Sequence, residues 1–352
     1  MRLPYRMDGP SCRLQAGRRD FHPVQHGEAG DRARDGGRAG EHGGVLDEVV
    51  TYLTCAHCRA GLARAGGSLR CRAGHVFDIA RHGYVSLIPA GARIPGGDTA
   101  AMVAARADFL AAGHFASLAA ELGRAAADAA GRAGRGGPPG AGCVVDVGAG
   151  TGYYLAAVLD RLPNRVGLAL DASRFSLRRA ARAHPRIGAV RCDAWRRLPV
   201  ADGAAALALS VFAPRNGAEL RRVLSPAGRL LVVTPMNDHL AELVGPLNLL
   251  TVDQRKPERL AATLSPHFGL AARREHRTVL PLDRKAVAAL AAMGPSSWHT
   301  DGPALAEAVA RLGERTPVTL AVMLSVYRPS PGPGHRARVR SGSEAGSQLG
   351  AQ

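Results

Sequence analysis

The alternation of apolar and polar segments divides the chain into a patterned middle and two unpatterned ends. From Cys143 onward, short apolar runs alternate with segments of helical periodicity. Uninterrupted apolar runs of this length, separated by helices, are typical of parallel strands that are buried on both faces. We therefore predict an α/β fold with a mostly parallel sheet over residues 143–329. The runs that predict strands are CVVDVGAG, RVGLALDAS, GAVRCDAW, AALALSVFAP and GRLLVVTP.

Two shorter blocks precede this region. Residues 104–131 are rich in alanine with helical periodicity, and a glycine-rich break follows at residues 134–142. We assign residues 91–142 to a helical linker that also serves as a lid over a cofactor. Residues 51–89 contain turn signals and paired cysteines, so we predict a small module over residues 49–90.

The two ends lack apolar periodicity. Residues 1–48 are rich in Gly, Arg and Asp, and we expect either a disordered extension or a segment upstream of a true start near Val45 or Val49. Residues 330–352 are rich in Pro, Gly and Ser and predict a disordered tail. The chain has neither a long uncharged apolar stretch nor a secretory signal pattern, so we predict a cytoplasmic protein without a membrane span.

The net charge of the chain indicates what kind of molecule it binds. The formal net charge is +17, from 46 Lys and Arg against 29 Asp and Glu. Such a surplus favours a polyanionic partner, because each phosphate contact releases condensed counterions. Nearly all the basic residues are arginines, however, which a GC-rich genome also produces without any nucleic-acid partner. Charge alone therefore favours RNA binding without establishing it.

Three of the six cysteines cluster in a metal-binding pattern. Cys55-Ala-His-Cys58 is followed by Cys71-Arg-Ala-Gly-His75. Two ligands on a tight knuckle and two more about a dozen residues later are the spacing of a tetrahedral structural zinc site. His57 is an alternative ligand, but its place between the knuckle cysteines would strain the chelate. The surrounding arginines suit contact with nucleic acid: Arg59, Arg64, Arg70, Arg72 and Arg81.

A glycine loop follows the first predicted strand. The segment from Asp146 to Gly152 reads DVGAGTG and joins a buried strand to a helix. Its glycines let the backbone approach a ligand closely. Similar loops bind dinucleotides in Rossmann folds, so the loop alone does not identify the cofactor. We predict that this segment contacts a cofactor through Asp146, Gly148, Gly150, Thr151 and Gly152.

Carboxylates at the ends of the next strands narrow the cofactor to S-adenosylmethionine. Asp171 ends the second strand, about twenty residues after the loop, where a carboxylate can accept the ribose hydroxyls. Asp193 ends the third strand and is placed to accept the adenine amino group. The alternative for Asp171 is a helix cap, although Ser173 can also serve as one. The predicted fold is thus a Rossmann-like S-adenosylmethionine-dependent methyltransferase domain with a small N-terminal zinc ribbon.

Several motifs together resemble one family. They are TYLTCAHC with CRAGHVFDIARHGYVSL, GDTAAMVAARADFLAAGHFASL, VVDVGAGTGYYL, RRAARAHP, SVFAPRN, LLVVTPMNDHLAELV and AMGPSSWH. In this combination the chain resembles the bacterial 23S rRNA (guanine-N1)-methyltransferases, in particular the actinobacterial branch associated with macrolide (tylosin-type) resistance. The resemblance extends from about Val49 to Pro329.

The resemblance implies an activity and site residues. The implied reaction is methyl transfer from S-adenosylmethionine to N1 of a guanine in a 23S rRNA hairpin loop, with macrolide resistance as a consequence and a homodimer as the assembly. Gly150, Thr151 and His239 match positions that contact the cofactor. Phe115 stands where the family typically carries a tyrosine that reaches the cofactor, so this chain lacks that hydroxyl. The implied zinc ligands are Cys55, Cys58, Cys71 and His75.

Methylation at N1 requires a site that orients the base and accepts its N1 proton. After the fourth strand, Arg215 can hold a phosphate and Asn216 can bind the guanine edge; the alternative is a strand-to-helix turn with Asn at the helix start. Trp298 is a candidate for stacking on a base, or else a core or lid residue. No catalytic base is singled out among the candidate histidines, which are His82, His114 and His299.

Two rival functions remain at this stage. A methyltransferase acting on a small molecule such as a quinone would explain the glycine loop but not the zinc motif or the charge. A zinc-ribbon RNA-binding protein with an inactive methyltransferase domain would explain the charge. Failure to bind S-adenosylmethionine would favour the inactive protein, and salt-dependent binding to rRNA hairpins would argue against the small-molecule enzyme.

Overall fold

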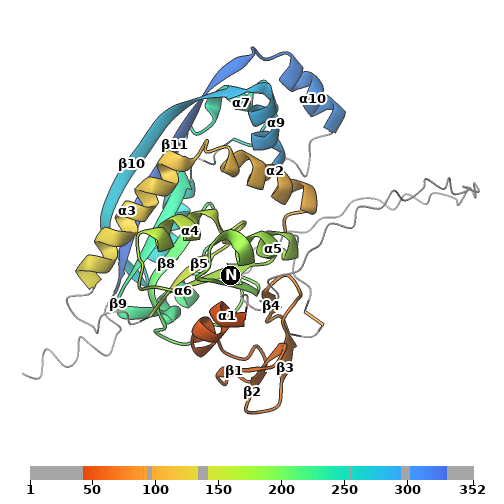
Figure 1. The fold of residues 1–352 in the computed structure, drawn as a ribbon. Coiled ribbons are helices and arrows are strands. Elements are labelled where there is room, and N and C mark those ends of the chain that lie inside the picture. Colours follow the sequence, from red (N-terminus) through yellow and green to blue (C-terminus); the bar gives the residue numbers. More distant parts are fainter. Residues whose placement is uncertain are drawn as a thin grey trace, which may run out of the picture. The chain divides into compact units, whose positions relative to one another are not determined.

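The structure, a computed structural model, describes residues 43–89, 91–92, 97–133, 142–251, 253, 255–294 and 302–330. It contains an eight-stranded sheet with helices on both faces, and a three-stranded antiparallel sheet formed by residues near the N-terminal end of the described part (Figure 1). The predicted α/β class is confirmed. The tail predicted at residues 330–352, apart from Ser330, and most of the predicted N-terminal extension lie outside the described residues.

The centre of the large sheet is parallel, as the apolar runs predict. Its strand order is β10-β11-β9-β8-β5-β6-β7-β4. From β5 the chain moves outward through β6 and β7, then returns to the other side of β5 with β8. This reversal places a ligand crevice at the carboxyl ends of β5 and β8. The five predicted strands are β5 (Cys143–Val147), β6 (Gly167–Asp171), β7 (Ile187–Arg191), β8 (Ala205–Val211) and β9 (Leu224–Pro235).

Helices cover both faces of the central strands of this sheet, which explains why these strands are apolar. Neighbouring residues of β5 face opposite layers: Val144 packs in the cluster that contains α3–α5, and Val145 packs in the cluster that contains α1, α6 and α8. Every residue of β5 is buried. The layer helices are α3 (Ala116–Ala133), α4 (Tyr153–Asp160) and α5 (Arg174–Ala183) on one face, with α1 (Gly43–Val49), α6 (Gly217–Val223) and α8 (Lys256–Leu264) on the other.

The N-terminal module is continuous with the large sheet rather than separate. Strand β4 (Tyr84–Ser86) pairs with β7 in parallel and forms the edge of the large sheet. Helix α1 packs on β7, where Leu46 and Val49 are buried. The boundary predicted at residue 48 therefore falls inside a helix, because an apolar face this short gives no visible periodicity. The module also contains η1 (Val50–Tyr52), β1 (Leu62–Ala65), β2 (Ser68–Cys71) and β3 (Val76–Asp78).

The region predicted as a linker and lid divides into two helices with different partners. Helix α2 (Ala100–Ala111) begins at Thr99, whose hydroxyl accepts the N–H of Met102 at 3.2 Å. It packs against α9 (Arg284–Ala292). Helix α3 packs on α4 and the sheet, so it belongs to the helical layer and not to a linker. Of these two helices, only α2 lines the cavity at the glycine loop.

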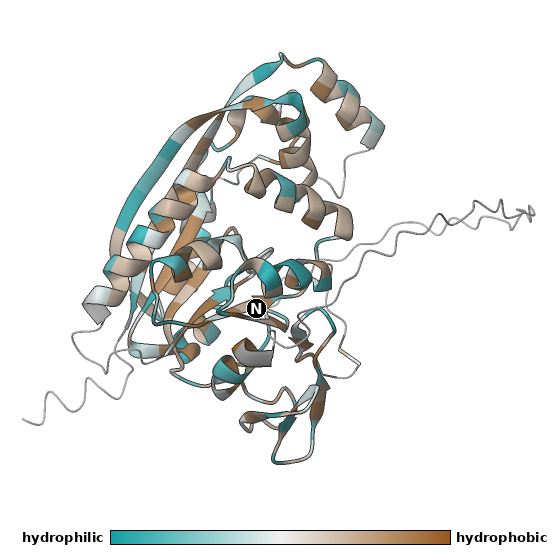
Figure 2. Cartoon of the chain, in the orientation of Figure 1, coloured by the Kyte–Doolittle hydropathy of each residue, from teal (hydrophilic) through white to brown (hydrophobic). Residues whose placement is uncertain are grey.

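A long antiparallel hairpin that the sequence patterns did not predict completes the sheet. Strand β11 (Arg315–Pro329) lies between β9 and β10 (Phe268–Asp283) and runs antiparallel to both. Strand β10 forms the other edge, and its middle is exposed and hydrophilic (Figure 2). Because charged residues stand at consecutive positions 273–275, β10 shows neither an apolar run nor alternation.

The remaining helices, α7 (Ala241–Val244) and α10 (Gly302–Ala310), precede and interrupt this hairpin, respectively. None of the described helices has the length and apolarity needed to cross a bilayer.

Candidate functional site

A cavity of about 390 Å³ lies at the carboxyl ends of β5, β6 and β8, where the strand order predicts a ligand site. The glycine loop, the end of β6 and helix α2 form its walls. The predicted residues that line it are Phe115, Gly148, Gly150, Thr151 and Asp171. Sequence patterns missed Asp98, Met102 and Arg106, which line it from the α2 side.

The three glycines of the loop serve different purposes. Gly148 has φ +73°, and a Cβ there would lie 2.6 Å from Cβ of Ala213. Gly150, at φ +55°, brings the backbone to the cavity wall. Gly152 begins helix α4, and a Cβ there would lie 3.0 Å from Cα of Ala180 on α5. The first two glycines thus shape the cavity, whereas the third allows two helices to pack closely.

Asp171 connects the end of β6 to the glycine loop. One carboxylate oxygen accepts the N–H of Gly150 at 2.9 Å, and the other accepts the N–H of Ser173 at 2.8 Å. Burial raises the pKa of Asp171, and these two hydrogen bonds oppose the shift. The start of α5 is capped by Ser173, which accepts the N–H of Ser176. Because each carboxylate oxygen has two lone pairs, Asp171 can still accept hydrogen bonds from a ligand.

Asp146 lies inside β5, behind the loop, and is only 1% exposed. Its Oδ1 atom has no hydrogen-bond partner within the part of the chain that the structure describes. Burial and, secondarily, the charge of Asp171 raise the pKa of Asp146 to about 7. The carboxyl group is therefore partly protonated near neutral pH.

Polar contacts hold helix α2 beside the cavity, on one side to the start of α5 and on the other to the end of α9. Arg106 pairs with Asp98 and donates to the backbone oxygen of Met293 at 2.7 Å, just after α9. The hydroxyl of Ser173 donates to the backbone oxygen of Asp98 at 2.8 Å. These contacts join α2 to α5 and α9 beside the cavity.

A second cavity of about 730 Å³ adjoins the first. The side chain of Arg215 lines it, and its Nε atom lacks a hydrogen-bond partner among the described residues. Burial lowers the pKa of Arg215. A guanidinium with an unsatisfied buried donor is suited to an electron-rich ligand atom. The wall shared by the two cavities consists of Arg106, Phe115, Phe212, Pro214 and Met293.

Phe212 stands in this shared wall with an unusual backbone conformation. Its φ is +53°, in the left-handed region that bulky residues rarely adopt. Its ring stacks on His239 with centroids 5.8 Å apart and meets Tyr154 edge-on. His239, predicted to contact the cofactor, lines the second cavity and is not among the residues that line the first. The Nδ1 atom of His239 accepts the N–H of Ala321, which leaves the ring proton on Nε2 when the ring is neutral.

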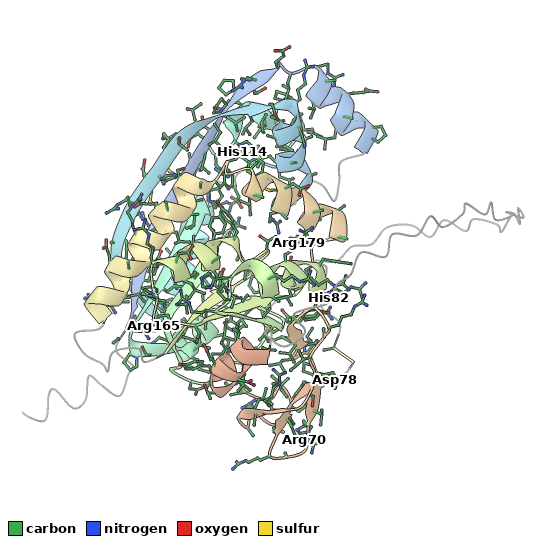
Figure 3. The ribbon with its side chains drawn as sticks, in the orientation of Figure 1. Arg70, Asp78, His82, His114, Arg165 and Arg179 are labelled. Carbon is green, nitrogen blue, oxygen red and sulfur yellow. The ribbon has the colours of Figure 1, made fainter. Side chains whose placement is uncertain are left out.

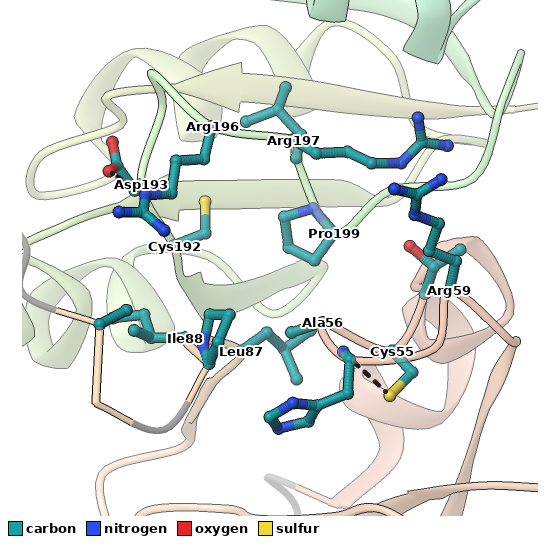
Figure 4. Close-up of a pocket in the computed structure, with 15 residues that line it drawn as sticks. Cys55, Ala56, Arg59, Leu87, Ile88, Cys192, Asp193, Arg196, Arg197 and Pro199 are labelled. Atoms are coloured by element: carbon teal, nitrogen blue, oxygen red, sulfur yellow. Dashed lines mark hydrogen bonds and ion pairs between the residues drawn. The ribbon is translucent and has the colours of Figure 1, made fainter. Parts of the chain in front are cut away.

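Two predicted ligand-binding residues instead organise a loop. Asp193 accepts the N–H of Trp195 at 2.9 Å and lies 3.5 Å from Nε of Arg196. It lines a third cavity, which faces the zinc module, and not the wall where adenine was expected (Figure 4). Asn216 accepts the N–H of Glu219 at 3.3 Å and donates to the backbone oxygen of Trp195 at 3.2 Å. The helix-start alternative for Asn216 is the one observed.

Among the histidines considered as proton acceptors, His82 and His114 do not line any of the three cavities. His82 is beside Arg182 on α5, and His114, at the turn between α2 and α3, packs against the ring of Phe109 in a tilted arrangement (Figure 3). Trp298 and His299 lie outside the described residues. No catalytic base is therefore assigned among these histidines.

The four predicted metal ligands come together in the N-terminal module. Their donor atoms all lie within 4.8 Å of one another. Sγ of Cys58 is 3.5 Å from Sγ of Cys71, and Nδ1 of His75 is 3.6 Å from Sγ of Cys55. A tetrahedral zinc with bonds of about 2.0–2.3 Å requires ligand separations of about 3.3–3.8 Å, so the donor set fits that ion.

The electrostatics of the cluster also suit a metal. Hydrogen bonds from His75 and Cys58 outweigh burial and lower the pKa of Cys71 to about 6. His57, the alternative ligand, instead stacks on the ring of His75 with centroids 4.8 Å apart. Four protein ligands leave no open coordination position, which is typical of a structural site.

Comparison with known proteins agrees with this arrangement. Residues 53–93 match the zinc-ribbon family described as RlmA, N-terminal, and residues 144–232 match a methyltransferase domain family. These matches confirm the predicted combination of a methyltransferase domain, which uses S-adenosylmethionine, with a zinc ribbon.

Three relatives have similar sequences over most of their length. A putative 23S rRNA (guanine-N1)-methyltransferase of Micromonospora griseorubida is 53% identical over 80% of this chain and 99% of its own. The 23S rRNA (guanine(748)-N1)-methyltransferase of Streptomyces fradiae is 50% identical over the same shares. A putative 23S rRNA (guanine-N1)-methyltransferase of Bacillus subtilis is 29% identical over 70% of this chain and 87% of its own. The similarity to the first two therefore covers both the zinc module and the catalytic domain.

Proposed function

The chain belongs to the family of 23S rRNA (guanine-N1)-methyltransferases, and we propose that it transfers a methyl group from S-adenosylmethionine to N1 of a guanine in a 23S rRNA hairpin loop. The observation that carries the proposal is identity of 50% or more to two such proteins across 99% of their length. The two adjoining cavities support it, since methyl transfer between two ligands requires sites that meet.

The smaller cavity is the proposed cofactor site. S-adenosylmethionine supplies a methyl group on a positively charged sulfur. Asp171 would accept the ribose hydroxyls while it holds the loop at Gly150. Gly148 and Thr151 would line the cofactor along the loop, and Phe115 would contact it by packing alone. Because Asp146 lies behind the loop, its role would be indirect, through the electrostatic repulsion between its carboxylate and that of Asp171.

The larger cavity is the proposed entrance for the target base. The shared wall at Phe212 and Pro214 is where a guanine would meet the methyl group. Guanine N1 becomes nucleophilic when it loses its proton, and the negative charge then spreads to O6. The guanidinium of Arg215, whose Nε atom has no hydrogen-bond partner among the described residues, is suited to stabilise that charge. His239 would hold Phe212 in position through their stacked rings.

The zinc ion would have a structural role. Its four ligands lie on the knuckle, at the last residue of β2 and just after that strand, and strand β4 then enters the large sheet. Holding this module folded would fix the arginines of the knuckle against the catalytic domain.

Three finer properties belong to the same proposal. We propose that the enzyme is a homodimer, that it acts in the cytoplasm, where ribosomal RNA is found, and that its methylation confers macrolide resistance. Light scattering of the purified protein tests the first. Expression in a macrolide-sensitive host tests the last, because the wild-type gene should raise the inhibitory concentration and an Asp171→Asn variant should not.

A defined reaction tests the proposed function. Purified, zinc-loaded protein is incubated with S-adenosylmethionine and a transcript of the 23S rRNA hairpin, and nuclease digests are examined by mass spectrometry. One N1-methylguanosine per transcript is expected, and it should disappear when the target guanine is replaced by adenine. Cofactor binding without RNA methylation would overturn the proposal and favour a small-molecule substrate; failure to bind the cofactor would favour an inactive RNA-binding protein.

A further inference from the structure

The loop after β7, residues 193–198, is held by hydrogen bonds along its length, although Trp195, Arg196 and Arg197 in its middle are exposed. At its start, Asp193 accepts the N–H of Trp195. In its middle, the backbone oxygen of Trp195 accepts from Asn216. At its end, the N–H of Leu198 donates to Glu219 at 2.8 Å, and the backbone oxygen of Leu198 accepts from Arg222 at 2.9 Å. Its backbone is therefore fixed at three points.

This rigid loop presents a tryptophan to solvent. The side chain of Trp195 is 66% exposed, although burial of a side chain this large is strongly favourable. A buried core role is thereby excluded for Trp195. A large aromatic ring on a fixed backbone is the arrangement that binding sites use, because little conformational entropy is lost when a ligand stacks on it.

The position of the ring selects what it can contact. Trp195 lines the second cavity but is not part of the wall shared with the cofactor cavity. A guanine that receives the methyl group must lie at the shared wall, near Phe212. The ring of Trp195 is therefore available to a different base, one that neighbours the target in the same strand.

The same loop carries two arginines that line the third cavity, on the zinc side. Arg196 and Arg197 line this space of about 220 Å³ together with Arg59, which reaches it from the zinc knuckle (Figure 4). Arg59 has φ +64°, so the backbone of the knuckle turns sharply at this residue. Carboxylates balance part of the charge, since Asp193 and Asp202 pair with Arg196 and Arg197. Three guanidinium groups facing a small space are suited to phosphate oxygens.

An aromatic ring flanked by arginines on one loop is the chemistry that binds single-stranded nucleic acid. We propose that Trp195 stacks on a base next to the target guanine, while Arg59, Arg196 and Arg197 bind the phosphates of the same strand. The RNA strand thus crosses the loop from the zinc module to the base cavity. This inference rests on the proposed function, because it names how the RNA substrate is held at that site.

Tryptophan fluorescence tests the stacking directly. The chain has two tryptophans, so a Trp298→Phe variant leaves Trp195 as the single reporter. Addition of the hairpin RNA to the enzyme with S-adenosylhomocysteine should quench Trp195 emission, because a stacked base deactivates the excited ring. Binding of the RNA, measured separately by gel shift, without any quenching would overturn the proposal.

Kinetics test the contribution to substrate binding. Trp195→Ala should raise the KM for the hairpin roughly five- to hundredfold, with the KM for S-adenosylmethionine unchanged, and Trp195→Phe should restore most of the loss. The matched control is Val279→Ala, which removes an exposed apolar side chain from β10 and should leave both values unchanged. An unchanged KM for RNA in Trp195→Ala would overturn the stacking role. A change in cofactor KM would indicate a structural role instead.

Salt dependence tests the phosphate contacts. Removing both Arg196 and Arg197 should reduce the slope of log affinity against log salt by about 1.4, whereas the exposed Arg311→Ala control should not change it. An unchanged slope would overturn this part of the inference. Failure of the proposed function itself is distinguishable, because the wild-type enzyme would then methylate no guanine at all.

Discussion

The carboxylate of Asp171 accepts the backbone N–H of Gly150 at 2.9 Å, which ties the end of strand β6 to the glycine loop after β5. Two motifs that are separated in sequence thus form one wall of the proposed cofactor site. The hydrogen bond fixes the loop at a positive-φ glycine, and the same carboxylate lines the cavity. The loop is therefore held in place before any ligand binds.

Substitution of Asp171 tests this relationship. Asp171→Asn removes the charge and replaces one of the two accepting oxygens, so S-adenosylmethionine affinity should fall roughly ten- to hundredfold. Isothermal titration calorimetry measures the change. The control is Asp160→Asn on α4. The side chain of Asp160 is 70% exposed, so this variant should bind S-adenosylmethionine with the affinity of the wild type. Equal affinity in Asp171→Asn would contradict the assignment.

The glycines of the loop should differ in their tolerance of a methyl group. Gly148→Ala places a Cβ 2.6 Å from Ala213, so it should lower the unfolding free energy by about 1–3 kcal/mol and impair cofactor binding. In Gly150→Ala the nearest atom is 3.6 Å away, on the flexible side chain of Arg106, so only the cost of positive φ remains and the loss of stability should be smaller. Thermal unfolding measures the loss of stability in both variants. A larger loss in Gly150→Ala than in Gly148→Ala would contradict this loop geometry.

Asp146 should make stability depend on pH. The carboxyl ionises near its ordinary pKa of 3.8 in the unfolded chain and near 7 in the fold. Because the folded pKa is raised, the wild type loses stability as pH rises from about 4 to 7, and the penalty is constant above that window. Asp146→Asn does not titrate, so its stability relative to the wild type should increase between pH 5 and pH 8, by about 2–3 kcal/mol. Denaturant unfolding at the two pH values measures this, and a constant difference would refute it.

Zinc should stabilise the whole fold through β4. Cys58→Ala removes one of four ligands, and the variant should bind no stoichiometric zinc and should melt at a lower temperature, because the module shares the edge of the large sheet. His57→Ala is the control: it changes a neighbouring residue that stacks on His75 but does not belong to the ligand set, so one zinc per chain should remain. Metal analysis measures the zinc content of each variant, and thermal unfolding measures its melting temperature. Zinc loss in His57→Ala would reinstate that residue as a ligand.

Arg215 should assist loss of the guanine proton. Arg215→Ala should lower kcat by about 10²–10³, comparable to removal of one donor from an oxyanion site. The deficit should shrink at higher pH, where guanine N1 ionises without help. Single-turnover methylation between pH 6.5 and 9.5 measures both effects, with Arg311→Ala as the charge-matched control. A pH-independent deficit would point to a phosphate contact for Arg215 instead.

Much of the fold could be predicted because its central strands are buried on both faces. The apolar runs around Val145 and Leu209 are continuous, and the spacing from Cys55 to His75 is specific for zinc. Strand β10 could not be predicted, because its exposed edge position permits the consecutive charges at Arg273 and Arg274. Helix α1 was also missed, since one turn of apolar contact through Leu46 and Val49 is too short to show a period.

Residues of the candidate site could be predicted where the backbone geometry requires one residue type. They were harder to predict where the role of a residue depends on the direction of its side chain. The cysteine knuckle and the glycines at 148 and 150 are required by local geometry. Asp193, by contrast, follows a strand just as Asp171 does, yet it accepts a hydrogen bond within its own loop. The solvent exposure of Trp195 could not be predicted from the sequence either, because its sequence neighbours do not reveal which residues pack on it.

Reverse transcription across 23S rRNA tests the central claim most directly. RNA from a host that lacks N1-guanine methylation is compared with and without this gene. N1 methylation blocks Watson–Crick pairing, so one new strong stop is expected next to a single guanine in a hairpin loop. The absence of any new stop, with the protein expressed and zinc-loaded, would contradict guanine-N1 methylation of this RNA.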